Sequence, residues 1–272
     1  MSAIANSGQT MPGSTALHFR NVAKTFDGGR GQPVTAVDDI NLSIEAGTFN
    51  CIIGPSGCGK STLLNMAAGL MEPSEGDVLY YGSPIDSPNQ RVGYLTQQSL
   101  LLPWRTVESN VGLALEIRGI APARRRQMVS AMLERVGLAG MGQRYPAQLS
   151  GGMQRRVSIA RTLIYEPETL LMDEPFGALD AQLRLGLQRQ LLSLWERDKK
   201  TVLFVTHDLE EAMFLGDNII VFGAAPGRIV HIEKIDFPRP RDPVALRGTA
   251  AFSAAWAKLW KLLEPQIAGE LN

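Results

Sequence analysis

The stretch Gly54-Pro55-Ser56-Gly57-Cys58-Gly59-Lys60-Ser61-Thr62 follows the pattern G-x-x-x-x-G-K-[ST] of a phosphate-binding loop. Residues 49–53 before it are β-prone, and residues 63–68 behind it favour a helix. The motif therefore lies at a strand-to-helix turn, where backbone N–H groups and the helix N-terminus face an anion. Glycines let the backbone wrap phosphate oxygens, Lys60 places an ammonium on the outer phosphates, and Ser61 can offer its hydroxyl to Mg²⁺. The alternative is a glycine-rich turn that only caps a structural helix.

The composition limits the class of protein. The chain has 272 residues, enough for one or two domains, and its 44% hydrophobic and 20% charged residues are ordinary for a globular protein. Lys plus Arg and Asp plus Glu both number 27, so the formal net charge is zero, which argues against a nucleic-acid-binding protein. The two cysteines, one inside the phosphate-binding loop, favour a reducing compartment over a disulfide framework. No apolar run reaches the ~18 residues of a membrane span, so a membrane role would require a partner.

Hydrophobic patterning on both sides of the phosphate-binding loop predicts a β-rich part and a helical part. Five runs are of β type: Leu17–Val22, Val34–Val37, Ile40–Ile44, Asp77–Tyr81 and Val92–Thr96. We expect the first three to form antiparallel strands that lead into the phosphate-binding loop. Helical spacing dominates from about residue 98 to 164, as in Arg124–Val136 and Val157–Leu163. We therefore expect a helical subdomain that stands off the β-rich parts.

Strands and helices alternate in the part of the chain that follows. In chain order the segments are Thr169–Met172 (strand), Ala181–Asp198 (helix), Thr201–Thr206 (strand), Leu209–Leu215 (helix) and Asn218–Phe222 (strand). Alternation of this kind predicts a parallel sheet. The expected fold class is therefore α/β, with a phosphate-loop NTPase core around a parallel sheet, an antiparallel β subdomain and an α-helical subdomain.

The two ends of the chain are expected to differ from the domain at 16–235 between them. Residues 1–15 are small and polar, without the basic start and apolar core of a signal peptide, so we expect a disordered leader. Residues 236–272 form a tail with an amphipathic helix, whose apolar face consists of Phe252, Trp256, Leu259, Trp260 and Leu263. This helix either docks on its own domain or makes a regulatory or membrane-surface contact.

Two carboxylates follow the apolar run Leu170-Leu171-Met172. A buried strand of this kind delivers Asp173 and Glu174 to the C-terminal edge of a sheet, where ligands bind. Asp173 can hold Mg²⁺ through water, and Glu174 can polarise an attacking water. The alternative is that both acids mark an ordinary helix N-terminus, which acidic residues favour.

Leu149-Ser150-Gly151-Gly152-Met153-Gln154 is a second candidate anion-binding turn. A Ser-Gly-Gly sequence that opens a helix would aim hydroxyl and N–H donors outward, although Ser150 could also be an ordinary helix N-cap. One chain rarely needs two such turns for one nucleotide. We therefore expect the second turn to serve a nucleotide held by another copy of the chain.

From about Leu17 to Ile232 the chain resembles the nucleotide-binding subunits of ATP-binding cassette (ABC) transporters. Gly54–Thr62 is similar to the Walker A loop of that family, and residues 149–154 are similar to its signature motif. Asp173 and Glu174 match its Walker B pair. The resemblance implies ATP and Mg²⁺ as cofactors, ATP hydrolysis with Glu174 as the base, and Lys60 among the residues that act on phosphate.

The resemblance also implies roles for four further positions. Phe26, in place of the commoner tyrosine, would stack on adenine. Gln97 would contact Mg²⁺ and the attacking water and sense the transmembrane partner. Ala178-Leu179-Asp180 would be the D-loop at a dimer seam, and His207 would contact the γ-phosphate. Taken without the resemblance, His207 could be a polar cap after a buried strand.

The partners implied by the resemblance are a second copy of the chain and a membrane complex. Two ATP molecules would lie between the Walker A loop of one chain and the signature motif of the other, in a head-to-tail homodimer. Transmembrane permease subunits would bind the dimer, and a periplasmic or extracellular solute-binding protein would be an indirect partner; no nucleic acid is implied. The chain would lie peripherally at the cytoplasmic face of the plasma membrane.

A finer resemblance is to importers of nitrate, taurine and aliphatic sulfonates. The residues that carry it are Leu101–Val107, Phe176–Gln182, Thr206–Ala212, Pro226–Ile229 and Pro238–Asp242. These stretches are less specific than the ATPase motifs, and importers of bicarbonate, cyanate and thiamine precursors share much of the pattern. The resemblance therefore favours a small anion as the transported solute without naming it.

The apolar stretch Leu100–Trp104 follows Gln97 directly. We interpret it as part of a groove that receives a coupling helix of the permease; the alternative is that it packs within the helical subdomain.

Two other functions are alternatives to transport. A soluble cassette ATPase acting on DNA or ribosomes would carry a long coiled-coil insertion or a second cassette, and this chain has neither. A nucleotide sensor without turnover would not need both Glu174 and His207, so ATP hydrolysis coupled to import is the favoured hypothesis.

Overall fold

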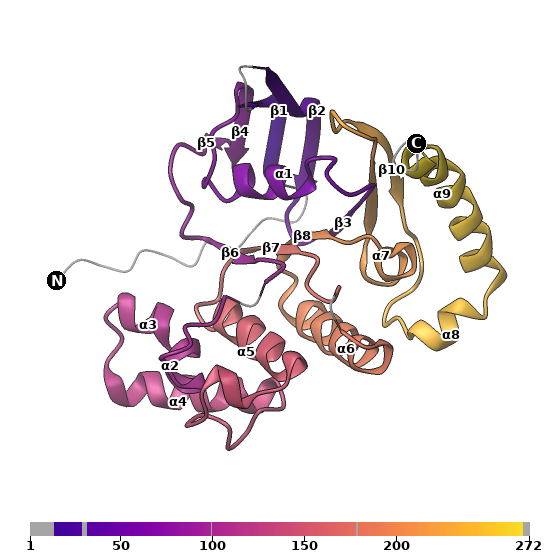
Figure 1. The fold of residues 1–272 in the computed structure, drawn as a ribbon. Coiled ribbons are helices and arrows are strands. Elements are labelled where there is room, and N and C mark those ends of the chain that lie inside the picture. Colours follow the sequence, from indigo (N-terminus) through magenta and orange to yellow (C-terminus); the bar gives the residue numbers. More distant parts are fainter. Residues whose placement is uncertain (1–13, 29–31, 99, 178, 269–272) are drawn as a thin grey trace.

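Two β-sheets enclose helix α1 (Lys60–Ala67) in the computed structural model, which describes residues 14–28, 32–98, 100–177 and 179–268 (Figure 1). A group of helices lies below the larger sheet, and the C-terminal helices cover one end of it (Figure 1). The expected α/β class with parallel, antiparallel and helical parts is confirmed.

The smaller sheet is antiparallel and has the strand order β2-β1-β4-β5. Its strands are β1 (Thr15–Asp27), β2 (Pro33–Glu45), β4 (Glu75–Tyr80) and β5 (Ser83–Pro84). The larger sheet has the order β10-β9-β3-β8-β7-β6, and β10 alone pairs antiparallel. Its strands are β3 (Phe49–Ile53), β6 (Val92–Leu95), β7 (Thr169–Asp173), β8 (Thr201–Val205), β9 (Asn218–Phe222) and β10 (Ile229–Lys234).

The remaining helices fall into three groups along the chain. The helical subdomain comprises α2 (Val107–Val111), α3 (Leu113–Ile117), α4 (Pro122–Arg135), the 3₁₀ turn η1 (Pro146–Gln148) and α5 (Gly151–Leu163). Helices α6 (Ala181–Asp198) and α7 (Leu209–Leu215) alternate with strands of the larger sheet. The tail contains α8 (Pro243–Arg247) and α9 (Ala250–Ala268).

The larger sheet is buried on both faces because its central strands are continuous apolar runs. In β8, Val202 and Phe204 belong to the core shared with the helices, whereas Leu203 and Val205 belong to the core shared with α1 and the smaller sheet. All four side chains are fully buried. The alternation of side chains along a strand thus lets one short run support two cores.

The parallel register brings the ends of three strands to one edge of the sheet. Strand β3 ends just before the phosphate-binding loop, β7 ends at Asp173, and β8 ends two residues before His207. Asp173 pairs in register with Val205, and the backbone N–H of Thr206 donates to the carbonyl of Ile52 at 3.1 Å. The carboxyl edge, where ligands bind in sheets of this class, therefore collects the predicted motifs.

The bounds of α6, α7 and β9 agree with those predicted from hydrophobic spacing. The runs Val34–Val37 and Ile40–Ile44 are different, because both belong to the single strand β2, whose pairing with β1 is interrupted by register shifts. Of the expected leader at 1–15, positions 1–13 lie outside the described residues, and the first strand begins at Thr15.

Helix α9 packs against α7 and β9. Phe252, Leu259 and Leu263 on its apolar face are buried, and half-buried Trp256 stacks on Trp260 with ring centroids 5.3 Å apart. The amphipathic helix therefore docks on its own domain, the first of the two alternatives. Within the described residues, none of the helices combines the length and apolar character that crossing a bilayer requires.

Arg241 connects the tail to the end of α7. Its side chain is 1% exposed and donates to the carbonyls of Phe214 (3.1 Å), Gly216 (2.6 Å) and Ile235 (3.2 Å). Burial lowers the pKa of Arg241 to about 10, so the side chain is still charged at neutral pH. A cation is favourable here because the last carbonyls of a helix carry partial negative charge.

Candidate functional site

The phosphate-binding loop crosses from β3 into α1 through a backbone that only glycine adopts easily. Gly59, the N-cap residue of α1, has φ +89°, in the left-handed region. A Cβ at this position would lie 2.4 Å from Cγ1 of Val37 and 2.7 Å from the carbonyl oxygen of Ala36. The glycine is thus required both by conformation and by the close approach of β2. The predicted strand–loop–helix context of residues 54–62 is present.

Lys60 is 6% exposed, and its ammonium lies inside the loop. Nζ donates to the carbonyls of Gly54 (2.9 Å) and Pro55 (2.5 Å) and lies 3.6 Å from Sγ of Cys58. A buried ammonium held by backbone dipoles places a positive charge where the loop can wrap an anion.

Asp173 ends β7 beside Ser61 and is 8% exposed. Burial raises the pKa of Asp173, whereas a hydrogen bond from Ser61 and the charges of Lys60 and Arg155 lower it. A hydroxyl and a carboxylate on neighbouring elements are oxygen ligands of the kind that Mg²⁺ prefers. Among the described residues, no group of three or more His, Cys, Asp or Glu side chains could hold a metal ion by itself.

Glu174 receives contacts from two other predicted site residues, Gln97 and His207. Nε2 of Gln97 donates to Oε2 of Glu174 at 3.1 Å, and Nδ1 of His207 lies 3.5 Å from the same oxygen. The Glu174 side chain is 23% exposed and His207 is 56% exposed, so water can reach the group. The structure therefore brings together three predicted residues that come from three separate loops.

The backbone of Glu174 adopts φ +41°, which a non-glycine residue seldom does. Conformations of this kind cost free energy and are concentrated at active sites, where the surrounding structure imposes them. The N–H of Glu174 donates to the carbonyl of Val205 at 3.0 Å, which fixes the turn to the end of β8. The sequence carried no signal for this strain.

A groove of about 1030 Å³ runs from this edge of the sheet to the helical subdomain. Its lining includes Gln97, Glu174 and His207 together with Leu100, Leu101 and Gly151. The groove therefore connects the predicted hydrolytic residues with both the apolar stretch after Gln97 and the second glycine turn.

The second glycine turn contains one glycine explained by packing and one that is not. Ser150 is the N-cap of α5, and its Oγ accepts a hydrogen bond from the N–H of Met153 at 3.4 Å. A Cβ on Gly152 would lie 2.1 Å from Cδ2 of Leu183 on α6, whereas a Cβ on Gly151 would meet nothing within 4 Å. The close approach of α6 accounts for Gly152, but no contact with the described residues accounts for Gly151.

Asp180 is the N-cap of α6, and its Oδ1 accepts a hydrogen bond from the N–H of Leu183 at 3.0 Å. Arg184 on the same helix donates to the carbonyl of Leu179 at 3.0 Å and pairs with Asp208, next to His207, at 3.3 Å. The expected D-loop is thus connected to the segment of His207; its first residue, Ala178, lies outside the described residues.

Phe26 lies on β1 in the smaller sheet, opposite Val34 of β2. Its ring is 38% exposed, and Nζ of Lys24 lies 5.5 Å from the ring centroid. The exposed ring is available for a planar ligand, but no hydrogen bond or ring contact among the described residues connects Phe26 to the phosphate-binding loop.

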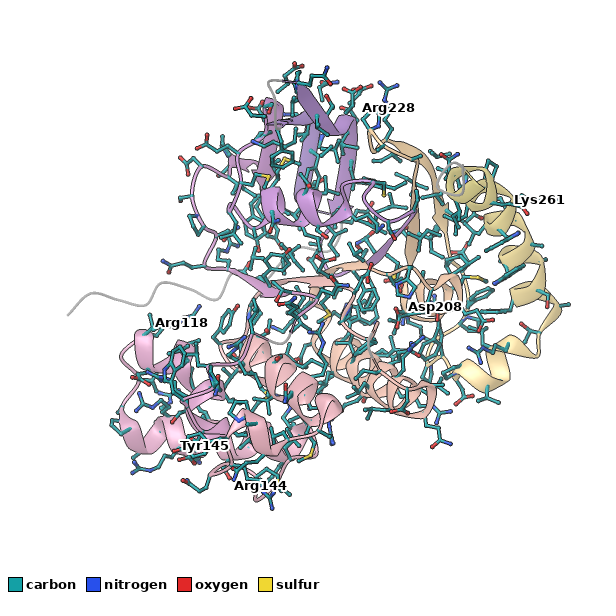
Figure 2. All side chains as sticks on the ribbon, viewed as in Figure 1. Arg118, Arg144, Tyr145, Asp208, Arg228 and Lys261 are labelled. Atoms are coloured by element: carbon teal, nitrogen blue, oxygen red, sulfur yellow. The ribbon has the colours of Figure 1, made fainter. Side chains whose placement is uncertain are left out.

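A turn that sequence reasoning assigned only to the finer resemblance contacts the phosphate-binding loop. The N–H of Gly227 donates to the carbonyl of Ala36 at 2.9 Å, and a Cβ on Gly227 would lie 1.9 Å from the carbonyl oxygen of Cys58. The neighbouring Arg228 forms an ion pair with Asp38 at the edge of the smaller sheet (Figure 2). This turn therefore connects the two sheets next to the phosphate-binding loop. In the sequence, only the stretch Pro226-Gly227-Arg228 indicated it.

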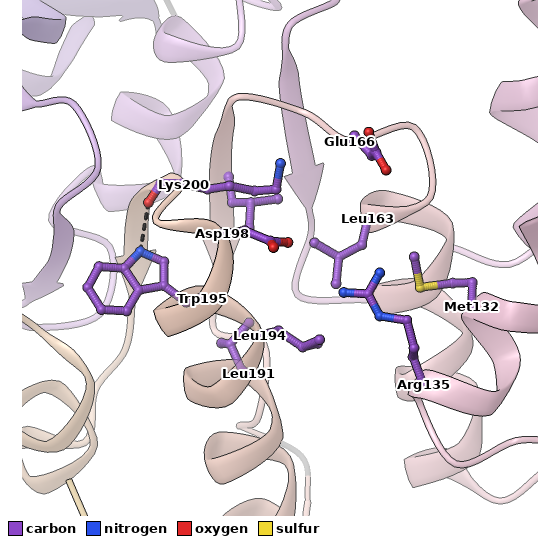
Figure 3. A pocket seen from close by; sticks show the side chains of 10 residues that line it. Met132, Arg135, Leu163, Glu166, Leu191, Leu194, Trp195, Asp198 and Lys200 are labelled. Atoms are coloured by element: carbon purple, nitrogen blue, oxygen red, sulfur yellow. Dashed lines mark hydrogen bonds between the residues drawn. The ribbon is translucent and has the colours of Figure 1, made fainter. Parts of the chain in front are cut away.

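A smaller hollow of about 180 Å³ lies between the helical subdomain and α6 (Figure 3). Met132 and Leu163 line it on one side and Leu191 and Leu194 on the other, with Lys200 at its rim (Figure 3). None of the predicted motif residues lines it, so it is not the candidate site.

Comparison with known proteins agrees with this geometry. The sequence model of the family described as ABC transporter matches residues 37–177. An uncharacterized ABC transporter ATP-binding protein of Methanocaldococcus jannaschii is 49% identical, over 94% of each chain. The nitrate import ATP-binding protein of Synechococcus elongatus is 43% identical over 90% of each chain. The aliphatic sulfonates import ATP-binding protein of Bacillus licheniformis is 46% identical over 92% of this chain and 94% of that one.

The fold is also similar to a solved structure described as the dimeric post-hydrolysis state of an ATP-binding cassette bound to ADP and Pi. The TM-score is 0.74 with 34% sequence identity, over 82% of this chain and all of the other.

Proposed function

Because this chain belongs to the ABC transporter family and is an ATPase of that family, we propose that it powers the import of a small anion such as nitrate, taurine or an alkanesulfonate. The observation that carries the proposal is the agreement between the site and the relatives. Glu174, which Gln97 and His207 contact, directly follows Asp173, and Asp173 accepts a hydrogen bond from Ser61 of the phosphate-binding loop. Relatives at 43–46% identity over at least 90% of this chain are named for nitrate and sulfonate import. The proposal places the chain at the cytoplasmic face of the membrane, held there by permease subunits.

Lys60, Ser61 and Asp173 are the residues that would hold the phosphates of ATP and a Mg²⁺ ion. Mg²⁺ in nucleotide sites takes one or two protein ligands and fills its other positions with phosphate and water, so one hydroxyl and one carboxylate fit it. When bound, the ion neutralises charge on the phosphates. Lys60 adds a second positive charge from inside the loop.

Glu174 is the residue proposed to accept a proton from the attacking water. Among the described residues, the hydrogen bond from Gln97 and the contact with His207 both reach Oε2, which favours one orientation of the carboxylate. A positioned general base typically contributes about 10²- to 10⁴-fold in rate. Gln97 is proposed to orient the same water, and His207 to contact the γ-phosphate.

The second glycine turn supports a site shared by two chains. Gly151 is exposed and helical, and a Cβ there would meet none of the described residues within 4 Å, so the part of the chain that the structure describes does not explain the missing side chain. A closely approaching phosphate from a second copy would explain it, because N–H groups at a helix start bind anions and a Cβ would keep the phosphate away. We infer a head-to-tail homodimer in which Ser150, Gly151, Gly152 and Asp180 meet the nucleotide of the partner.

The loop after Gln97 is built to present Trp104 to a partner. Asn110 is fully buried; its Oδ1 accepts from the N–H of Leu102 at 2.8 Å, and its Nδ2 donates to the carbonyl of Arg105 at 3.0 Å. This bridge fixes a short loop in which Trp104 is 72% exposed. Such exposure does not fit packing within the helical subdomain, and a fixed, exposed aromatic residue fits a protein contact.

Replacing Trp104 by alanine is expected to weaken assembly with the permease by about 1 kcal/mol or more, while ATP binding by the isolated chain stays the same. Co-purification with permease subunits and nucleotide titration measure the two effects. Trp260→Ala, which removes an exposed tryptophan from α9 elsewhere on the molecule, is the matched control. Unchanged assembly of the Trp104 variant would exclude this loop from the permease groove.

Deletion of the gene is expected to abolish growth when one of taurine, an alkanesulfonate, nitrate or bicarbonate is the sole source of the nutrient that it supplies (sulfur, nitrogen or carbon). Growth on the other three should continue. The reason is that solute choice lies in the other subunits, whereas this chain supplies the energy. Restoration by the parent chain but not by a Lys60→Ala variant would connect the defect to ATP. Normal growth on all four solutes and normal uptake of them would overturn the proposal.

A further inference from the structure

Arg155 is a buried cation on α5, four residues into the helix that begins at Gly151, and it forms no ion pair within the described residues. Burial lowers the pKa of Arg155 to about 10, with Asp173 acting in the opposite direction. The side chain is 3% exposed, yet the guanidinium is still charged at neutral pH. A charge in this position costs free energy unless hydrogen bonds compensate it, so its partners are informative.

The partners of Arg155 are backbone carbonyls of the two loops that hold the hydrolytic side chains. Nη1 donates to the carbonyls of Thr96 at 2.8 Å and Gln97 at 3.3 Å. Nε donates to the carbonyl of Pro175, directly after Glu174. One guanidinium therefore bonds on both sides of the hydrogen bond between the Gln97 and Glu174 side chains.

The same side chain connects these loops to the second glycine turn. Arg155 lies one turn of helix after Gly151, and both residues line the 1030 Å³ groove together with Gln97 and Glu174. Nη2 of Arg155 is buried without a hydrogen-bond partner among the described residues. A fork-shaped, rigid donor of this kind holds several acceptors in one geometry, which a flexible ammonium does not.

We propose that Arg155 is a positioning residue. It holds the loops of Gln97 and Glu174 in fixed positions relative to each other and to the start of α5. Hydrolysis then depends on Arg155 through these two side chains, although Arg155 itself touches neither nucleotide nor water. A shift of α5 moves both loops as one unit. The inference rests on the proposed role of Gln97.

Arg155→Met, which keeps length but removes all donors, is expected to lower kcat for ATP hydrolysis by about 10- to 100-fold, because small displacements of catalytic groups have effects of that size. The KM for ATP should stay within about twofold, because the hydrogen bonds of Arg155 among the described residues go to Thr96, Gln97 and Pro175 and not to the phosphate-binding loop. Arg155→Gln keeps one donating amide and is expected to retain an intermediate kcat. Steady-state phosphate release from the purified full chain measures all three, and the Gln variant also serves if the Met variant does not fold.

Arg156→Met is the control for loss of an arginine donor from the same helix, although Arg156 is half-buried rather than buried. Arg156 is the next residue of α5, and its Nη1 donates to the carbonyl of Gly137 at 3.1 Å, inside the helical subdomain. The control should lose stability in thermal unfolding without a matching loss in kcat. If Arg156→Met lowers kcat as much as Arg155→Met, the role of Arg155 is only structural and the inference is wrong.

A double-mutant cycle with Gln97→Ala tests whether Arg155 acts through Gln97. Residues that act as one unit give non-additive effects, so the fold-loss of the double variant should be clearly smaller than the product of the two single fold-losses, although the part of the Arg155 effect that runs through Glu174 remains. Fold-losses that multiply would show independent action and overturn the inference, as would an unchanged kcat for Arg155→Met. A normal kcat for Gln97→Ala alone would instead show that the proposed role of Gln97 is wrong.

Discussion

A Glu174→Gln variant is expected to hydrolyse ATP about 10²- to 10⁴-fold more slowly than the parent chain, with unchanged affinity for ATP. Glutamine has the same shape as glutamate, so the contacts from Gln97 at 3.1 Å and His207 at 3.5 Å can still be made to the side-chain oxygen. What glutamine lacks is the ability to take a proton from water. Slow hydrolysis with intact binding should also make the variant accumulate as a closed dimer in ATP.

Phosphate release and nucleotide titration on the same preparation measure the two halves of this prediction. Glu166→Gln is a suitable control, since Glu166 is also a glutamate with a positive φ, +55°. Glu166 lines the small hollow and belongs to none of the predicted motifs. The control separates loss of the base from loss of charge at a strained turn. A hydrolysis rate of Glu174→Gln near that of the parent would remove Glu174 from its proposed role and reopen the hypothesis of a nucleotide sensor.

The order of elements was predictable from the sequence because periodicity and burial agree in the core. The helix Ala181–Asp198 and the strand Asn218–Phe222 have apolar patterns long or continuous enough to identify both type and bounds. Strand β10 was not predicted. Its burial alternates between half-buried and exposed, and it is held by pairing with β9 and by the Lys258–Glu233 ion pair from α9. Such support comes from distant segments, which a local pattern does not contain.

The site was predictable where a motif requires particular residue types. Gly59 is needed for both its φ and its closeness to β2, and such a double requirement leaves a recognisable spacing in the sequence. Arg155 and Arg241 left no comparable signal, because arginine is ordinarily exposed and its burial here depends on carbonyls far away in the chain. The positive φ of Glu174 is likewise imposed by tertiary contacts.

Gly151→Asp is expected to reduce ATP hydrolysis by on the order of 10²-fold while stabilising its own helix. The first position of a helix favours an acidic side chain, so α5 should form at least as well as before. In a head-to-tail dimer, however, the new carboxylate would face the phosphates held by the partner, and losing one preorganised donor site costs about 10²- to 10³-fold. If the variant is at least as stable as the parent chain but hydrolyses ATP more slowly, Gly151 serves an intermolecular site. A glycine needed only for structure would instead lose stability when replaced. Gly186→Asp, on an exposed face of α6 with nothing within 4 Å of its Cβ position, is the control that should change neither.

Mixing the Gly151→Asp and Glu174→Gln chains gives the sharper form of this prediction. In a mixed head-to-tail dimer, one site combines both defects, while the other combines the intact Glu174 of the first chain with the intact Gly151 of the second. Random pairing of equal amounts should therefore restore intact sites to about a quarter of the total in a symmetric two-site dimer. The measurement is phosphate release as a function of mixing ratio, with each variant alone as the baseline. Recovery at equal ratio can arise only if Gly151 serves the nucleotide of the other chain, and a mixture no faster than the separate variants would place both residues in one chain's site.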